Sequence, residues 1–129
     1  MASDAPVILL AEPHPPSADL ISTLLDNLGL TSHVVTTSQS LLEYLLTDGA
    51  SVVLLSIDLP DMDGFGTTRQ IRDLERKRLI PAVVVIGLTP QGLIDERHLC
   101  LDAGMDGQVS KPVSIGRLSA ALSPYPLRP

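Results

Sequence analysis

The chain has 129 residues, of which 44% are hydrophobic and 19% are charged, and its formal net charge is −6. This composition fits one ordinary domain with a substantial core and argues against a disordered tail. The acidic balance argues against nucleic acid as a direct partner, because a phosphate-binding surface needs clustered Lys and Arg.

The first half of the sequence alternates strand and helix patterns. The apolar run at residues 7–11 predicts a strand that is covered on both faces. Apolar residues at helical spacing then predict a helix that opens at Pro15 and Pro16 and stops at Gly29. Three elements follow in the same alternation: a strand at 33–36, a helix capped by Ser38 and ending at 48–49, and a buried strand at 52–57.

The second half continues the alternation. A helix from about Phe65 to Arg78 is expected to place its basic residues, which stand next to acids, on a solvated face. A helix opened by Pro90 and closed at Gly104 carries Cys100, which is interpreted as a buried structural residue. The remaining elements are a strand at 82–88, a strand at 108–110, and a last helix capped by Ser114. The domain is expected to span 1–123, with 124–129 as a C-terminal tail or linker.

Five alternations of strand and helix predict a doubly wound α/β fold, with a parallel sheet covered by helices on both faces. In such sheets the functional crevice lies at the carboxyl ends of the strands. The residues at these ends are therefore the candidates for a site: Glu12, Pro13, His14, Ser56, Asp58, Thr89, Lys111 and Pro112. The three histidines are scattered and have no zinc-site spacing, so no metal ligand is assigned.

Two segments at these strand ends, residues 58–64 (Asp-Leu-Pro-Asp-Met-Asp-Gly) and residues 103–112 (Ala-Gly-Met-Asp-Gly-Gln-Val-Ser-Lys-Pro), resemble receiver domains of response regulators. The second segment is most similar to receivers of hybrid histidine kinases. The resemblance covers about residues 6–123 and implies a flavodoxin-like, CheY-like fold with five strands in the order 2-1-3-4-5 and five flanking helices. It also implies paired acids that hold Mg²⁺, a phosphate-accepting Asp, and a Thr and a Lys that bind the phosphoryl oxygens.

The chain departs from this family pattern at three positions. Counting back eight residues from Gly64 along the motif places Ser56 at the phosphate-acceptor position. An Asp is ionised at neutral pH, whereas a serine hydroxyl needs an adjacent base, and His14 is not expected to reach it. Pro13 stands at the second acid position, and Gln108 stands where the family usually has a switch aromatic. Four residues keep the family pattern: Glu12, Thr89, Lys111 and Pro112.

The sequence thus favours a phosphorylation-incompetent receiver, without enzymatic activity, that serves as a regulatory module in two-component signalling. Its expected partners are a histidine kinase core or another signalling domain, within a hybrid kinase as one option, and a weak homodimer is a further candidate. No cofactor is expected, with Mg²⁺ binding weak or absent, and Lys111 is expected to pair with Glu12 or Asp58. The absence of a signal peptide and of a bilayer-length apolar run favours a cytoplasmic location without membrane contact.

Two alternative functions stay open. The first is an active phosphotransfer receiver that uses Asp58 or Ser56 as its acceptor. The second is a pseudo-receiver that senses a small molecule, such as a cyclic dinucleotide, although no arginine-rich recognition motif is visible.

Overall fold

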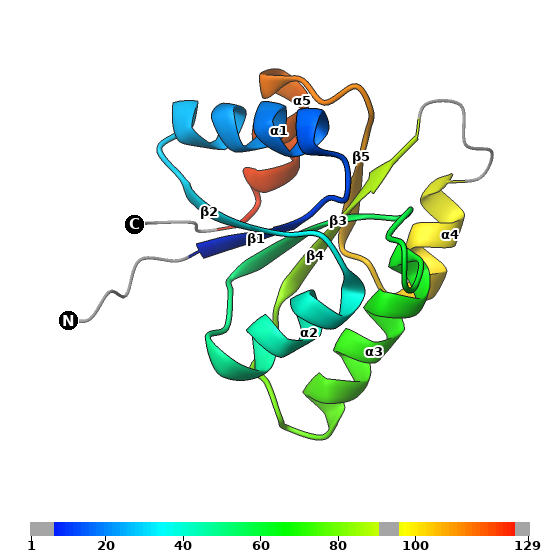
Figure 1. The fold of residues 1–129 in the computed structure, drawn as a ribbon. Helices are drawn as coiled ribbons and strands as arrows, with labels where there is room; N and C mark the ends of the chain where they lie inside the picture. The colour runs from blue at the N-terminus through cyan, green and yellow to red at the C-terminus, as the bar shows by residue number, and fades with distance from the viewer. Residues whose placement is uncertain (1–6, 91–95, 126–129) are drawn as a thin grey trace.

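A five-stranded parallel sheet in the order β2-β1-β3-β4-β5 forms the centre of the molecule (Figure 1). The structure is a computed structural model and describes residues 7–90 and 96–125. Helices α1 and α5 cover one face of the sheet, and α2, α3 and α4 cover the other. The strands are β1 Val7–Ala11, β2 Thr31–Val35, β3 Val52–Ser56, β4 Val84–Thr89 and β5 Gly107–Ser110. The helices are α1 Pro15–Asn27, α2 Ser38–Thr47, α3 Gly64–Arg76, α4 Glu96–Ala103 and α5 Ile115–Leu122. Fold class and strand order are as predicted.

The core consists of two layers, one on each face of the sheet. Side chains of a strand point alternately to opposite faces, so one strand contributes to both layers. In β1, Leu9 and Ala11 pack in the layer with α2, α3 and α4, whereas Ile8 and Leu10 pack in the layer with α1 and α5. All four residues are buried. This two-sided burial is the reason why the central strands read as continuous apolar runs.

Most element boundaries agree with the sequence pattern, and the helix starts show why. Ser114 caps α5 as predicted, since its side chain accepts from Arg117 N at 3.2 Å. The prediction that Ser38 caps α2 is wrong, because Thr37 is the cap and accepts from Ser40 N at 3.0 Å. Ser38 is instead the buried first residue of the helix, and its hydroxyl accepts from Thr67 at 2.8 Å.

Helix α4 is described from Glu96 onwards, and its predicted opening after Pro90 lies outside the described residues. Cys100 is fully buried, which confirms its interpretation as a structural residue. Leu99 and Leu101 on either side of it are exposed. In the part of the chain that the structure describes, no helix is long and apolar enough to cross a membrane.

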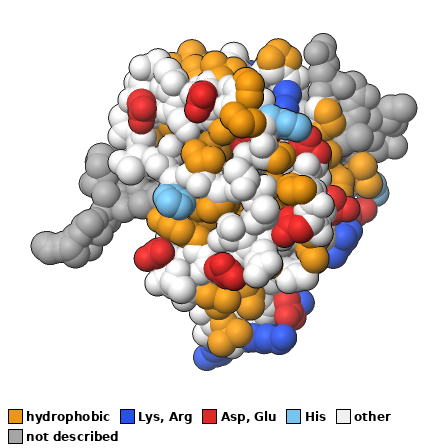
Figure 2. Space-filling model, viewed as in Figure 1, with side chains coloured by type: hydrophobic (Ala, Val, Ile, Leu, Met, Phe, Trp, Pro, Cys, Tyr) orange, Lys and Arg blue, Asp and Glu red, His pale blue; other side chains and the backbone are white. Residues whose placement is uncertain are grey.

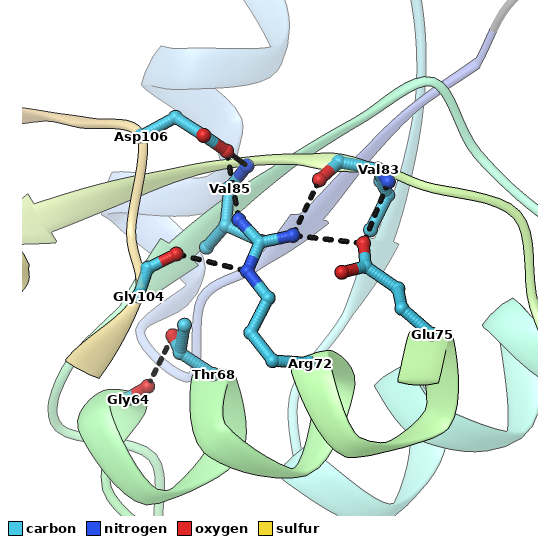
Figure 3. Close-up of polar contacts among 8 residues, drawn as sticks. All are labelled: Gly64, Thr68, Arg72, Glu75, Val83, Val85, Gly104 and Asp106. Atoms are coloured by element: carbon cyan, nitrogen blue, oxygen red, sulfur yellow. Dashed lines mark hydrogen bonds and ion pairs between the residues drawn. The ribbon is translucent and has the colours of Figure 1, made fainter. Parts of the chain in front are cut away.

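The prediction of a purely solvated basic face on α3 is wrong for Arg72 (Figure 3). Its guanidinium donates to Gly104 O at 2.9 Å and to Val83 O at 2.8 Å. It also pairs with Glu75 and Asp106, each at 2.8 Å. This network ties α3 to the start of β4 and to the turn between α4 and β5. Charge spacing along one helix gives no sign of these long-range acceptors.

Candidate functional site

The four carboxyl-terminal strand ends that carry the candidate residues meet at one edge of the sheet. Glu12 directly follows β1, Ser56 ends β3, Thr89 ends β4, and Lys111 directly follows β5. The parallel register pairs Ser56 with Leu88 and Thr89 with Ser110, so these ends lie at similar height. Glu12, Ser56 and Thr89 are completely buried. The fold therefore gathers an acid, two hydroxyls and a lysine in one pocket.

Lys111 connects the two sides of this pocket. Its Nζ lies 2.7 Å from Glu12 Oε1 and donates to Ser56 Oγ at 3.2 Å. The contact with Glu12 is an ion pair without the geometry of a directed hydrogen bond, so it counts as charge compensation. Pairing compensates a buried carboxylate, which would otherwise be strongly destabilising. The expected pairing of Lys111 with a carboxylate is confirmed. The peptide bond between Lys111 and Pro112 is cis, as the family pattern implies.

Ser56 is held between a donor and an acceptor. Its hydroxyl donates to Asp58 Oδ1 at 2.5 Å while its oxygen accepts from Lys111. The other carboxylate oxygen of Asp58 lies 3.0 Å from His14 Nε2. Burial raises the pKa of Asp58, but hydrogen bonds from Ser56 and His14 and the charge of Lys111 outweigh it, so the pKa is lowered overall. Asp58 is therefore a fixed anion beside the acceptor position.

The metal-binding pattern of the site is altered by Pro13. This half-buried residue follows Glu12 and has no side-chain oxygen to offer a cation. The other carboxylate oxygen of Glu12 accepts from His14 N at 3.2 Å. Both oxygens of Glu12 thus already have a protein contact, one ionic and one a hydrogen bond.

The loop after β3 is fixed by residues whose roles the sequence did not reveal. Asp61 accepts from Ser38 N at 2.8 Å and from Gln39 N at 3.0 Å, so it binds the start of α2. These two N–H groups hold the pKa of Asp61 below its ordinary value. Asp63 caps α3 by accepting from Gly66 N at 2.7 Å. The acids of the motif therefore serve the loop itself.

Gly64 is required by a close approach of two backbone segments. A Cβ at this position would lie 2.7 Å from Ile57 Cα and 2.9 Å from Ser56 O. A side chain would thus push the motif loop away from the end of β3. This steric demand explains why the motif carries glycine eight residues after Ser56.

Gln108 lies on β5, half-buried, at some remove along the strand from the carboxyl end. It lines a depression between β5 and α5 together with Ser110, Lys111, Ser114 and Arg117. Its amide side chain stands where the family pattern has an aromatic ring.

His14 joins the pocket in a way that its position in the sequence did not indicate. One ligand atom each of Glu12, His14 and Asp58 lies within 4.8 Å of the others. His14 and Asp58 are 44 residues apart and come from different loops. Strand order, which makes β1 and β3 neighbours, brings them together, so spacing of histidines alone could not find the cluster.

A parallel sheet of this order, with a buried acid, a lysine and hydroxyls at its carboxyl edge, has the architecture of a signalling receiver. The chain belongs to the response regulator receiver domain family, whose model matches residues 8–123. It is a receiver domain of two-component signalling, homologous to the receivers of hybrid kinases.

Individual relatives agree with this assignment. The chain is 31% identical to the sensor histidine kinase RcsC of Salmonella typhi over 124 residues, which are 96% of this chain and 13% of that protein. It is 29% identical to the sensor histidine kinase GacS of Pseudomonas protegens over 119 residues, covering 92% of this chain and 13% of that protein. The chain therefore spans about an eighth of the length of these curated relatives.

A solved structure shows the same fold at similar identity. The receiver domain of the sensor histidine kinase PA1611 from Pseudomonas aeruginosa, with a magnesium ion coordinated in its active site cleft, superposes with a TM-score of 0.81 at 30% identity. The match covers 94% of this chain and 97% of that one.

Proposed function

We propose that this receiver does not accept phosphate and acts as a protein-interaction module that regulates a histidine kinase core or another signalling domain. The observation that carries the proposal is the state of the acceptor position. Ser56 is fully buried, and its hydroxyl is hydrogen-bonded to Asp58 and Lys111 instead of presenting an ionised carboxylate.

Phosphoryl transfer to Ser56 would need a base that removes the hydroxyl proton. Asp58 is the group in contact, but its lowered pKa makes it a weak proton acceptor at neutral pH. His14 contacts Asp58 and makes no printed contact with the Ser56 hydroxyl. A phosphoserine, once formed, would also be a stable ester and would not reset quickly.

The residues present also fit poorly to the Mg²⁺ site that family membership implies. Mg²⁺ prefers a near-octahedral shell of oxygens that usually includes carboxylates from the protein. Here Pro13 offers no oxygen, Ser56 offers a neutral hydroxyl, and Glu12 is paired with Lys111. We infer that Mg²⁺ binding is weak, so the charge of a transferring phosphoryl group would not be neutralised by it.

The role as an interaction module is supported by the relatives and by the surface. The matched relatives are sensor histidine kinases in which the counterpart of this chain is a small part of a larger protein. On the face shown in Figure 2, the Lys and Arg side chains lie mainly beside acidic ones and form no broad basic surface among the described residues. This charge distribution favours a protein partner over nucleic acid.

Incubation of the chain with acetyl phosphate and Mg²⁺, followed by mass spectrometry, tests the proposal. We expect no gain of a phosphoryl group. We expect little gain for Ser56→Asp, because Pro13 still leaves the metal position empty of a carboxylate, and a clear gain for Pro13→Asp combined with Ser56→Asp. Ready labelling of the unchanged chain at Ser56 or Asp58 would overturn the proposal in favour of an active phosphotransfer receiver.

A further inference from the structure

Three side chains around the ends of β1 and β3 have the composition of a metal site, although it differs from the oxygen site of the family. Glu12 comes from the end of β1, His14 from the loop before α1, and Asp58 from the loop after β3. One potential ligand atom from each lies within 4.8 Å of the other two. The side chains of His14 and Asp58 are 60% and 54% exposed, so an ion and its water ligands can reach them.

The buried carboxylate of Glu12 is an independent indication that this space suits a cation. Glu12 is fully buried, and among the described residues its Oε1 accepts no well-directed hydrogen bond. The pairing with Lys111 compensates its charge but leaves coordination capacity on the oxygen. Buried oxygens normally have their hydrogen-bonding capacity filled, and a bound cation is one way to fill it.

The chemistry of the donor set determines which cation it suits. Mg²⁺ takes oxygen ligands, whereas an imidazole nitrogen shifts preference towards Zn²⁺, Co²⁺ and Ni²⁺. One histidine with two carboxylates and water is a common environment for such ions. In this chain the imidazole of His14 is next to Pro13, the position that lost its oxygen ligand.

We propose that Glu12, His14 and Asp58 form a site for a divalent transition metal, with Zn²⁺ as the physiological candidate. The ion would take the place of the contact between His14 and Asp58 and would join the loops that follow β1 and β3. Two carboxylates and the lysine leave the pocket with a net charge of −1, which still favours a dication. The inference is independent of whether the chain accepts phosphate.

Titration calorimetry on the whole chain, freed of any histidine tag, tests this site directly. We expect one Zn²⁺ per chain, a melting temperature raised by Zn²⁺, and little response to Mg²⁺ at the same concentration. Co²⁺ serves as a spectroscopic probe, because its visible absorption bands report a nitrogen and oxygen shell. His14→Ala should weaken Zn²⁺ binding by about tenfold or more, because changes of mere supporting residues already cost that much.

His98→Ala is the matched control. His98 lies 3.1 Å from Asp102 on the surface of α4, so it forms a similar histidine–carboxylate pair without a buried third ligand. We expect this variant to bind Zn²⁺ like the unchanged chain, and Asp58→Asn to bind it as weakly as His14→Ala. Circular dichroism verifies that the variants are folded. Failure to bind Zn²⁺, equal affinity for Mg²⁺, or loss of binding in His98→Ala but not in His14→Ala would overturn the proposal.

Discussion

Replacing Arg72 by methionine removes the guanidinium that joins α3 to β4 and to the turn before β5, while an unbranched apolar stem is kept. The arginine side chain is only 20% exposed, so water can replace part of its contacts but not all of them. Two backbone carbonyls, those of Gly104 and Val83, would lose a charged donor. The variant therefore leaves polar groups without their partners in a largely enclosed place.

The size of the effect follows from what each partner retains. Glu75 still accepts from Val83 N, and Asp106 still accepts from Val85 N, each at 2.8 Å. The carboxylates are thus only partly deprived, and the main loss is at the two carbonyls. We expect the free energy of unfolding to fall by about 2–4 kcal/mol. For a domain of this size, that corresponds to a melting temperature lower by roughly 8–16 °C.

Arg76→Met on the same helix is the control. The Arg76 side chain is 70% exposed, and its partner Asp73 is also held by Lys77 at 2.9 Å. Such surface pairs contribute little, so the loss should stay below about 0.5 kcal/mol.

Urea denaturation followed by far-ultraviolet circular dichroism gives both values, since the chain has no tryptophan for fluorescence. A loss below about 1 kcal/mol for the Arg72 variant, or equal losses for the two variants, would refute the reasoning that the enclosed network stabilises the fold.

Three further predictions concern the pocket. Lys111→Met leaves the buried carboxylate of Glu12 unpaired and should cost about 3–5 kcal/mol, whereas adding Glu12→Gln should restore much of this in a urea-denaturation cycle; additive losses would contradict the ion pair. Because hydrogen bonds and Lys111 outweigh burial and lower the pKa of folded Asp58, its contribution to stability is present above the unfolded value, near pH 4, and is lost as pH falls through the folded pKa. Asp58→Asn should therefore flatten acid destabilisation slightly, by less than about 1 kcal/mol given its exposure, and an unchanged pH profile would argue against the contacts. Gly64→Ala should cost about 1–3 kcal/mol because its Cβ meets backbone at 2.7 Å, while Gly116→Ala in α5, with nothing within 4 Å, should be neutral or stabilising.

The sequence predicted the sheet well because the central strands are buried on both faces. The apolar run at residues 7–11 coincides with β1, and turn residues such as Gly29 mark the helix ends. These signals are local, so one sequence suffices to see them. The choice between Thr37 and Ser38 as the cap of α2 could not be made in this way, because adjacent hydroxyl residues offer the same chemistry and tertiary contacts decide between them.

The site was predictable only where it follows the strand ends. The motif spacing led to the meeting of Glu12, Ser56 and Lys111, which the structure contains. The contact between His14 and Asp58 depends on side-chain directions in two loops, and the acceptors of Arg72 lie up to 34 residues away. Such contacts are set by tertiary packing, and no periodicity in the sequence records them.

The division of the core by the sheet allows each side of the molecule to be softened separately. Ile21 on α1 packs only in one layer, and Ile71 on α3 packs only in the other. An Ile→Val change at either position would loosen its own layer by about 0.5–1.5 kcal/mol and leave the opposite helices in their packing. Comparing how the two variants bind a kinase core would show which face of this receiver the partner uses, without altering a single surface residue.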